Sequence, residues 1–240
     1  MKIFFVRHGQ TQANIDKRFY TLDDSIHPIT DRGEKQAIHT GKYLNKIGNF
    51  DLIISSPRLR CIQTATLISK EIGYKDDIII NKLIMEENVT KIVSKQKNPL
   101  EIFKKNKKIC KIYNELIKTK DPFKLINLQE KHDNQYFKII HDDYNINSEI
   151  LNLKKFLNQL KKLNKKSILV VTHGGIIELI QRIITNTEFT NLNIFSKDND
   201  KYIKSSYYEE GNTNIMACLL NDGKFKLVIP SNTLHLADLK

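Results

Sequence analysis

Cysteine and proline are scarce in this sequence of 240 residues. The three cysteines, Cys61, Cys110 and Cys218, lie far apart and form no CxxC pair, so the sequence indicates neither a disulfide framework nor a thiolate metal site. With only five prolines and an apolar content of 40%, the sequence also argues against extensive disorder. We therefore expect a compact protein in a reducing, intracellular environment.

Long apolar runs are missing as well. The run at residues 3–6 is too short for the core of a signal peptide, and no uninterrupted apolar run approaches the length needed to cross a membrane. We therefore expect a cytoplasmic protein with no membrane span.

Arginine is rare, with six residues against 33 lysines in a chain of net charge +12. Lysine is concentrated in residues 91–131, where twelve lysines stand against four acidic residues. Such a segment can form the solvated face of a helix, or it can attract an anionic substrate, a nucleic acid or an acidic membrane. Because no aromatic and glycine pattern of an RNA-binding domain accompanies the lysines, nucleic acid is not the expected partner.

Short aliphatic stretches alternate with helical patterns along the chain. Buried strands are predicted at residues 2–6, 51–54 and 167–171. Helices are predicted to begin near four positions: Thr30, Pro57, Ser148 and Gly174. This alternation predicts an α/β fold of three layers, in which a mainly parallel sheet lies between two layers of helices.

Two further regions depart from the alternation. Residues 215–220 and 224–229 flank the turn sequence Asn221-Asp222-Gly223 and are predicted to form a β-hairpin that completes the sheet. Residues 88–147 are rich in lysine and weakly helical, and they lack the strand and helix pattern of the rest. We expect a single domain over residues 1–240, with an insertion at about 88–147 packed over one edge of the sheet.

Histidine follows two of the predicted strands. His8 comes after the first strand and is preceded by Arg7, and His173 comes after the third and is followed by two glycines. Parallel strands bring their carboxyl ends to the same edge of a sheet, so the two histidines should lie close together. The glycines allow close approach of the backbone to a ligand, and the helix that follows presents free N–H groups, an arrangement that suits an anion.

The few arginines are placed unevenly. Five of the six occur within the first 60 residues, and four of these, Arg7, Arg32, Arg58 and Arg60, stand near the predicted strand ends or helix starts. A planar guanidinium group binds phosphate through two parallel hydrogen bonds, which lysine cannot do. For Arg32 we expect an ordinary surface pair, whereas the others stand beside the predicted strand ends or helix starts and indicate a phosphate site.

These segments together resemble the histidine phosphatase superfamily, also called the phosphoglycerate mutase-like family. The resemblance covers about two thirds of the chain and leaves out the lysine-rich insertion. It rests on Arg7-His8-Gly9 with Thr11 and Asn14, on residues 27–37, on Ser55 to Ala65 with the pattern SSPRLRCIQTA, on Thr172-His173-Gly174-Gly175, and on residues 232–236.

The resemblance implies a role for each matching residue. His8 would be the nucleophile, which attacks phosphorus and forms a phosphohistidine intermediate. The phosphoryl group would be bound by six residues: Arg7, Thr11, Asn14, Arg60, His173 and Gly174. In the same register, Arg58 is not a phosphate ligand and is expected at the surface, at the start of a helix.

A carboxylic acid is also needed, to protonate the leaving group and later to activate water. Aligning Ile84 with the leucine of the family's LxE pattern makes Glu86 this acid, with Glu87 as its competitor. The sequence departs from the family here, because Asn88-Val89-Thr90 replaces the usual DFG-like continuation. Gly174 stands where the phytase-like branch carries an aspartate, which favours the other branch, branch 1.

The remaining histidines show no HxH or HExxH spacing, so no metal and no other cofactor is expected. The leading hypothesis is a metal-independent phosphomonoester hydrolase that acts on a small anionic phosphometabolite through phosphorylated His8. One alternative is a mutase that returns the phosphoryl group to its substrate. A second is a catalytically weak scaffold that uses the basic insertion to bind a partner.

Overall fold

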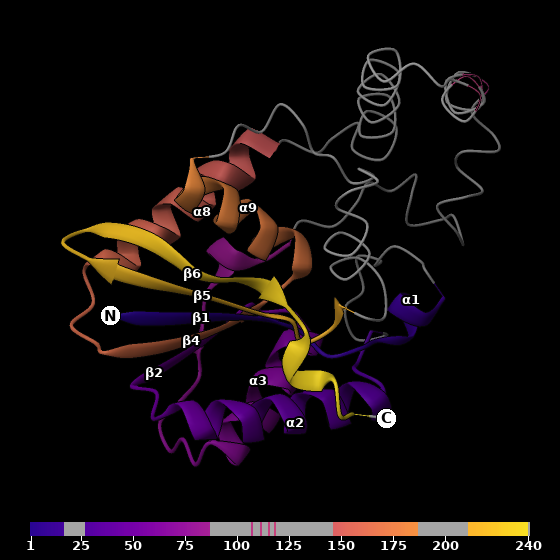
Figure 1. Ribbon diagram of the computed structural model, residues 1–240, viewed down its shortest axis with the longest axis horizontal. Helices are drawn as coiled ribbons and strands as arrows, with labels where there is room; N and C mark the ends of the chain where they lie inside the picture. Colours follow the sequence, from indigo (N-terminus) through magenta and orange to yellow (C-terminus); the bar gives the residue numbers. More distant parts are fainter. Residues whose placement is uncertain are drawn as a thin grey trace.

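The structure is a computed structural model that describes residues 1–16, 27–86, 146–186 and 211–239, together with four isolated positions, Lys107, Lys111, Glu115 and Lys118. The core of this part is a six-stranded sheet with the strand order β3-β2-β4-β1-β5-β6 (Figure 1). Helices lie on both faces of the sheet, which confirms the predicted three-layer α/β architecture.

Four strands of the sheet run parallel: β1 (Lys2–Arg7), β2 (Leu52–Ser55), β3 (Ile79–Ile80) and β4 (Ser167–Thr172). The hairpin of β5 (Ile215–Asn221) and β6 (Lys224–Asn232) adds two antiparallel strands beside β1. The mainly parallel sheet and the closing hairpin are therefore confirmed. The two-residue strand β3 was not predicted, because so short a stretch carries no periodic signal.

The two faces of β1 explain how the layers are built. Ile3 and Phe5 point into a core formed with α8 (Ile146–Lys161) and α9 (Gly174–Thr185). Phe4 and Val6 point into the opposite core, formed with α2 (Asp31–Ile47) and α3 (Leu59–Glu71). Because successive side chains of a strand alternate between faces, one apolar strand holds both helical layers against the sheet.

The observed first residues of the helices lie close to the predicted ones. Thr30 caps α2, since its hydroxyl accepts a hydrogen bond from the Gly33 N–H at 3.1 Å. α9 begins at Gly174, as predicted, whereas α8 begins at Ile146, two residues before the predicted Ser148. Three short helical turns complete the described elements: α1 (Gln12–Ile15), η2 (Lys82–Ile84) and η5 (Leu234–Leu236).

The predicted insertion at 88–147 lies outside the described residues except for its last two positions and the four isolated ones. Of these four, Lys107, Lys111 and Glu115 are helical and exposed. The packing of the insertion and the single-domain organisation remain predictions. Within the described ranges, no helix is both long and apolar enough to cross a membrane.

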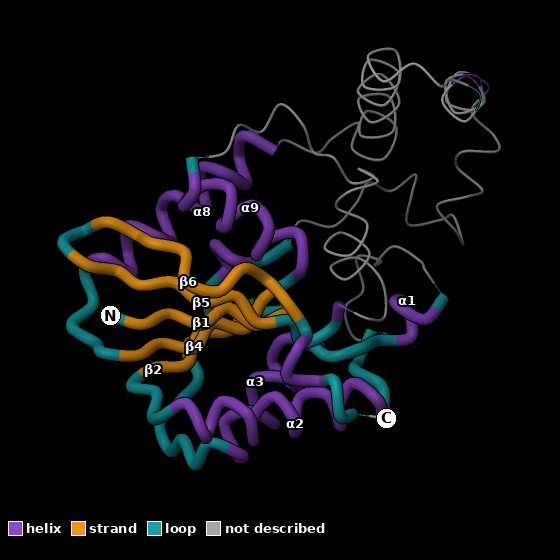
Figure 2. Tube along the Cα trace, in the orientation of Figure 1, coloured by secondary structure: helices purple, strands orange, loops and turns teal. Residues whose placement is uncertain are grey.

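The loops that follow β1, β2 and β4 meet at one end of the sheet, as the tube drawing shows (Figure 2). This is the end at which the sequence places His8 and His173, one residue beyond β1 and β4. The fold therefore brings together the strand ends on which the predicted site depends.

Candidate active site

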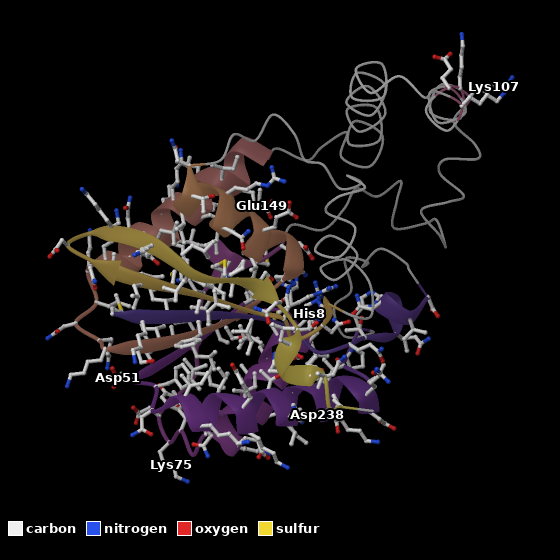
Figure 3. All side chains as sticks on the ribbon, in the orientation of Figure 1. His8, Asp51, Lys75, Lys107, Glu149 and Asp238 are labelled. Atoms are coloured by element: carbon white, nitrogen blue, oxygen red, sulfur yellow. The ribbon has the colours of Figure 1, made fainter. Side chains whose placement is uncertain are left out.

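His8 lies at the carboxyl end of β1 and is almost completely buried (Figure 3). Its N–H donates to the Thr172 carbonyl at 2.9 Å, which extends the pairing of β1 with β4 by one residue. On the ring, Nδ1 lies 2.8 Å from the Gly9 carbonyl oxygen. Because a carbonyl only accepts hydrogen bonds, Nδ1 carries the proton and Nε2 keeps its lone pair.

The surroundings of His8 keep its ring neutral. Burial, followed by the positive charges of Arg60 and Arg7, holds the pKa of His8 well below its ordinary value of 6.5. The hydrogen bond to the Gly9 carbonyl acts in the opposite direction and does not outweigh these effects. At neutral pH the imidazole therefore presents the unprotonated Nε2 that nucleophilic attack requires.

His173 follows β4 and is fully buried beside His8, with the two ring centroids 5.6 Å apart. Its Nε2 lies 2.9 Å from the Ser56 hydroxyl, and its Nδ1 lies 3.2 Å from Nη2 of Arg60. Burial, and then the charge of Arg60, hold the pKa of His173 well below its ordinary value as well. The predicted pairing of the two strand-end histidines is thus present in the fold.

Two buried arginines complete the positive lining of the site. Arg7 is the last residue of β1 and Arg60 lies in the first turn of α3, with exposed fractions of 4% and 1%. A guanidinium group presents N–H donors in a planar fork that matches the oxygens of a phosphoryl group. Two such groups beside two neutral histidines therefore form a site suited to a phosphoryl group.

Glu86 lies beside the same group of side chains. One of its carboxylate oxygens, Oε2, lies 3.7 Å from Arg60 Nη2 and 3.7 Å from His173 Nδ1, and its side chain is 30% exposed. The Thr172 hydroxyl anchors this segment by donating to the Ile84 carbonyl at 2.7 Å. The carboxylate is therefore next to the histidines and open to solvent, while the competing Glu87 lies outside the described residues.

Asn14 is held in one orientation by Thr11 and by a residue that the sequence did not single out. Its Oδ1 accepts hydrogen bonds from the N–H and the hydroxyl of Thr11, each at 3.0 Å, and from Nδ2 of Asn212 at 3.1 Å. With the oxygen occupied, the Nδ2 group of Asn14 is the part that can donate to a ligand. Thr11 then acts mainly through Asn14.

The phosphate-binding role of Gly174 stays a prediction, and the structure gives its place in the fold. Gly174 is buried and is the first residue of α9, directly after His173. The first N–H groups of a helix have no partners within that helix, and they carry the positive end of its dipole. The backbone at Gly174 therefore adds to the anion-binding character of the pocket.

Sequence reasoning missed three residues that build the site. Ser56 and Thr64 stand inside the quoted motif, but no role followed from the motif alone. Thr64 links two active-site segments, since its hydroxyl accepts from the Gly9 N–H at 2.9 Å and donates to the Arg60 carbonyl at 2.7 Å. Asn212 donates to the His8 carbonyl at 3.1 Å, a contact across 204 residues that no local pattern could reveal.

Arg58 lies at the start of a helix, as expected. It is the N-cap residue of α3 and only partly exposed, and its charge is near enough to contribute to the lowered pKa of His173. The expected place at the start of a helix is therefore confirmed, and the side chain is partly exposed.

Among the described residues, no group of three or more histidine, cysteine, aspartate or glutamate side chains is arranged to hold a metal ion. The independence from metals and from other cofactors stays a prediction.

Comparison with known proteins concerns the family and the fold. The sequence profile of the histidine phosphatase superfamily (branch 1) matches residues 3–105, which confirms the resemblance in this part of the chain. The serine/threonine-protein phosphatase Pgam5 of Drosophila ananassae is 35% identical over 86 residues, which are 35% of this chain and 28% of the relative. The match thus spans less than a third of that relative's length.

Two solved structures are similar over nearly the whole chain. A phosphoserine phosphatase of Entamoeba histolytica in complex with phosphoserine superposes with a TM-score of 0.66 at 23% identity, covering 98% of both chains. A phosphoglycerate mutase of Bacillus anthracis gives a TM-score of 0.66 at 17% identity, covering 99% of this chain and 95% of its own. The chain therefore has the histidine phosphatase and phosphoglycerate mutase fold.

Proposed function

We propose that this chain, whose residues 3–105 match the histidine phosphatase superfamily (branch 1), hydrolyses phosphate monoesters through a phosphohistidine formed on His8. One observation carries the proposal. A neutral, buried His8 with an unprotonated Nε2 lies with its ring centroid 5.6 Å from that of buried His173, and the charges of buried Arg60 and Arg7 are near enough to lower the pKa of His8. A nucleophile and a site for phosphoryl oxygens thus occur together.

In the first step, His8 Nε2 attacks phosphorus while the bond to the leaving oxygen breaks. Glu86, in its protonated form, gives its proton to that oxygen, so an alcohol leaves and the phosphoryl group remains on His8. Arg7, Arg60 and the Asn14 amide hold the equatorial oxygens, on which the charge of the transition state is spread.

In the second step, water attacks the phosphohistidine. The carboxylate of Glu86, left ionised by the first step, takes a proton from the water as the new P–O bond forms. The P–N bond breaks, inorganic phosphate leaves, and His8 and Glu86 return to their starting states. Every step uses groups of this chain and water alone.

The proposed substrate is a small anionic phosphometabolite. The excess of positive charge in the chain supports an anionic substrate, because a positive field raises the local concentration of anions. Phosphate release from a panel of sugar phosphates, nucleotides and phosphorylated amino acids would test this choice.

The experiment that tests the activity is hydrolysis of p-nitrophenyl phosphate by the full chain and by His8→Ala. We expect the variant to lose at least about a thousandfold in kcat, because the proposed covalent route runs through His8 Nε2. His39→Ala is the matched control, since His39 lies on α2 and contacts the His235 carbonyl instead of the pocket. Full activity of His8→Ala would refute the mechanism.

A mutase uses the same pocket and returns the phosphoryl group to the substrate. Incubation with phosphoglycerate, with and without bisphosphoglycerate, separates the two activities. Release of phosphate supports the hydrolase, whereas isomerisation that depends on bisphosphoglycerate supports the mutase. The scaffold alternative depends on the lysine-rich segment, most of which lies outside the described residues.

A further inference from the structure

Both ring nitrogens of His173 have a defined neighbour in the fully buried ring. Nε2 lies 2.9 Å from Ser56 Oγ, and Nδ1 lies 3.2 Å from Arg60 Nη2. These contacts come from opposite sides of the imidazole, so together they determine which way the ring faces. Ser56 plays no part in the mechanism proposed above.

The two neighbours also determine where the proton of the neutral ring sits. A guanidinium group has only N–H donors, so Arg60 can approach Nδ1 only if Nδ1 is an acceptor. The proton of neutral His173 must then lie on Nε2, which donates it to the Ser56 hydroxyl oxygen. Cys61 Sγ also lies near Nε2, but at the longer distance of 3.6 Å, and sulfur is a weak acceptor.

We propose that Ser56 is a positioning residue, which holds His173 in the Nε2–H tautomer and so keeps Nδ1 turned toward Arg60, Glu86 and the phosphoryl pocket. The catalytic consequence of this arrangement rests on the proposed phosphatase function. The tautomer itself does not, because it follows from contacts within the protein.

Ser56 is well suited to this task because its own position is rigid. It is fully buried just beyond β2, and its N–H donates to the Val171 carbonyl at 2.9 Å. A hydroxyl oxygen has two lone pairs, so it can accept from His173 and also from the Arg58 N–H, which lies 3.5 Å away.

The contact between Ser56 and His173 Nε2 also determines how His173 can become protonated when phosphate binds. A phosphoryl oxygen is an acceptor, so Nδ1 must gain a proton from the solvent before it can donate to that oxygen. The Nε2–H group can keep its hydrogen bond to Ser56 Oγ during this change. The resulting imidazolium then donates from Nε2 to Ser56 and from Nδ1 to the phosphoryl oxygen. Ser56 thus supports His173 in both of its protonation states.

The first test is the tautomer of His173 in the wild-type chain, measured from imidazole ¹⁵N chemical shifts in long-range ¹H–¹⁵N spectra at neutral pH. We expect Nε2 to be protonated and Nδ1 unprotonated, and both nitrogens to become protonated when orthophosphate is added. A protonated Nδ1 in the free protein would overturn the proposal, whether or not the chain is a phosphatase.

The second test compares Ser56→Ala with Ser55→Ala. Ser55 is an equally buried neighbour whose hydroxyl donates to the Ser56 carbonyl instead of to a histidine, so it controls for loss of a buried hydroxyl. In Ser56→Ala we expect a mixture of His173 tautomers and a kcat for p-nitrophenyl phosphate lower by about tenfold, the effect of one lost hydrogen bond. Ser55→Ala should keep the wild-type His173 spectrum.

The His173 tautomer and the kcat for phosphate release together separate a failure of the Ser56 proposal from a failure of the proposed activity. If Ser56→Ala keeps the single Nε2–H tautomer and an unchanged kcat, Ser56 does not position His173. If the wild-type chain has the expected tautomer but releases no phosphate from any monoester, the positioning stands and the proposed activity fails.

Discussion

The reactivity of His8 depends on one backbone carbonyl. Gly9 O accepts the Nδ1 proton at 2.8 Å, so the lone pair of the neutral ring is on Nε2. The peptide unit of His8 is itself held by the Thr172 carbonyl, by Asn212 and by the Thr213 N–H. The proposed nucleophile is thus oriented by its backbone, and the residues proposed to bind phosphate need only bind the substrate.

Glu86→Gln should separate the proton-transfer role of this side chain from its packing. Glutamine cannot donate an acidic proton, so we expect kcat to fall by about 10²- to 10⁴-fold for an alkyl phosphate, whose leaving group needs protonation. The loss should be smaller for p-nitrophenyl phosphate, since nitrophenolate leaves without help. Steady-state kinetics on both substrates measure the difference.

The control for this change is Glu71→Gln, at the other end of α3 from Arg60. Glu71→Gln should leave kcat unchanged for both the alkyl phosphate and p-nitrophenyl phosphate. Equal losses on the alkyl and nitrophenyl esters in Glu86→Gln would contradict a role as general acid.

Asn212→Ala should weaken both the fold and the site. The Nδ2 group of Asn212 bridges the His8 carbonyl and Asn14 Oδ1, each at 3.1 Å, in a fully buried environment. We expect the free energy of unfolding to fall by about 1–3 kcal/mol, as for other buried hydrogen-bonding groups that lose a partner. Denaturant unfolding measures this, with the exposed Asn221→Ala as a control that should change stability by less than about 0.5 kcal/mol. Equal stabilities of the two variants would argue against the bridge.

At the scale of the elements, the first turn of α2 supports the loop that follows His8. The Gln10 N–H donates to Gln36 Oε1 at 3.0 Å, and the Thr30 hydroxyl donates to Gln10 Oε1 at 2.8 Å. The helix and the loop are in such close contact that a Cβ atom on Gly33 would lie 2.3 Å from the Gln10 carbonyl oxygen. This packing explains why a glycine stands in the first turn of a helix, where it otherwise costs stability.

Gly33→Ala should therefore be harmful although alanine is the better helix former. The new methyl group has to push the Gln10 backbone away, and we expect a loss of about 1–3 kcal/mol in the free energy of unfolding. Activity should also fall, because Gln10 is only two residues from His8. The exposed Lys35→Ala in the same turn is the control. A gain in stability for Gly33→Ala would show that the loop can move without cost.

At the scale of the whole molecule, two buried histidines and one half-buried histidine link stability to pH. The pKa values of His8 and His173 lie well below 6.5, and burial together with His39 lowers the pKa of His235 to about 4. His235 belongs to η5, which packs against α2 through a 2.9 Å contact between its Nε2 and the Thr40 hydroxyl. All three side chains are neutral in the folded protein and charged in the unfolded protein at mildly acidic pH.

The sign of the pH effect follows from the proton balance. Below the unfolded pKa of about 6.5, the unfolded chain binds more protons than the folded one, so stability falls as pH falls, by about 1.4 kcal/mol per pH unit for each such histidine. For His235 this loss should continue down to its folded pKa of about 4.

His235→Asn isolates the contribution of His235 in η5 to the pH dependence of stability. Between about pH 6 and 4.5 the free energy of unfolding should fall less steeply in the variant than in the wild type, with slopes that differ by about 1.4 kcal/mol per pH unit. The reason is that asparagine binds no proton in either the folded or the unfolded chain. Urea unfolding at a series of pH values gives both slopes. Parallel slopes would mean that His235 titrates alike in the folded and unfolded chain.

Much of this protein could be predicted from local patterns. The aliphatic strands, the capped helices and the glycine turn of the hairpin each depend on nearby residues, and their period and capping groups are visible in the sequence. The meeting of His8 and His173 also followed, because parallel strands end at one edge. The strand β3 and the contact of Asn212 with His8 did not follow, since a two-residue strand has no period and the contact joins residues 204 positions apart.

The sequence by itself determined the kind of site: which strands end in histidine, which arginines stand near them, and where an acid follows. Only the tertiary structure decided how these groups are oriented and protonated. The proton on His8 Nδ1, the Ser56 contact of His173 and the Asn212 bridge all arise between atoms that folding brings within 3.1 Å, two of them from segments more than 100 residues apart. Hydrogen bonds depend on distance and direction in space, and a linear pattern of residues specifies neither.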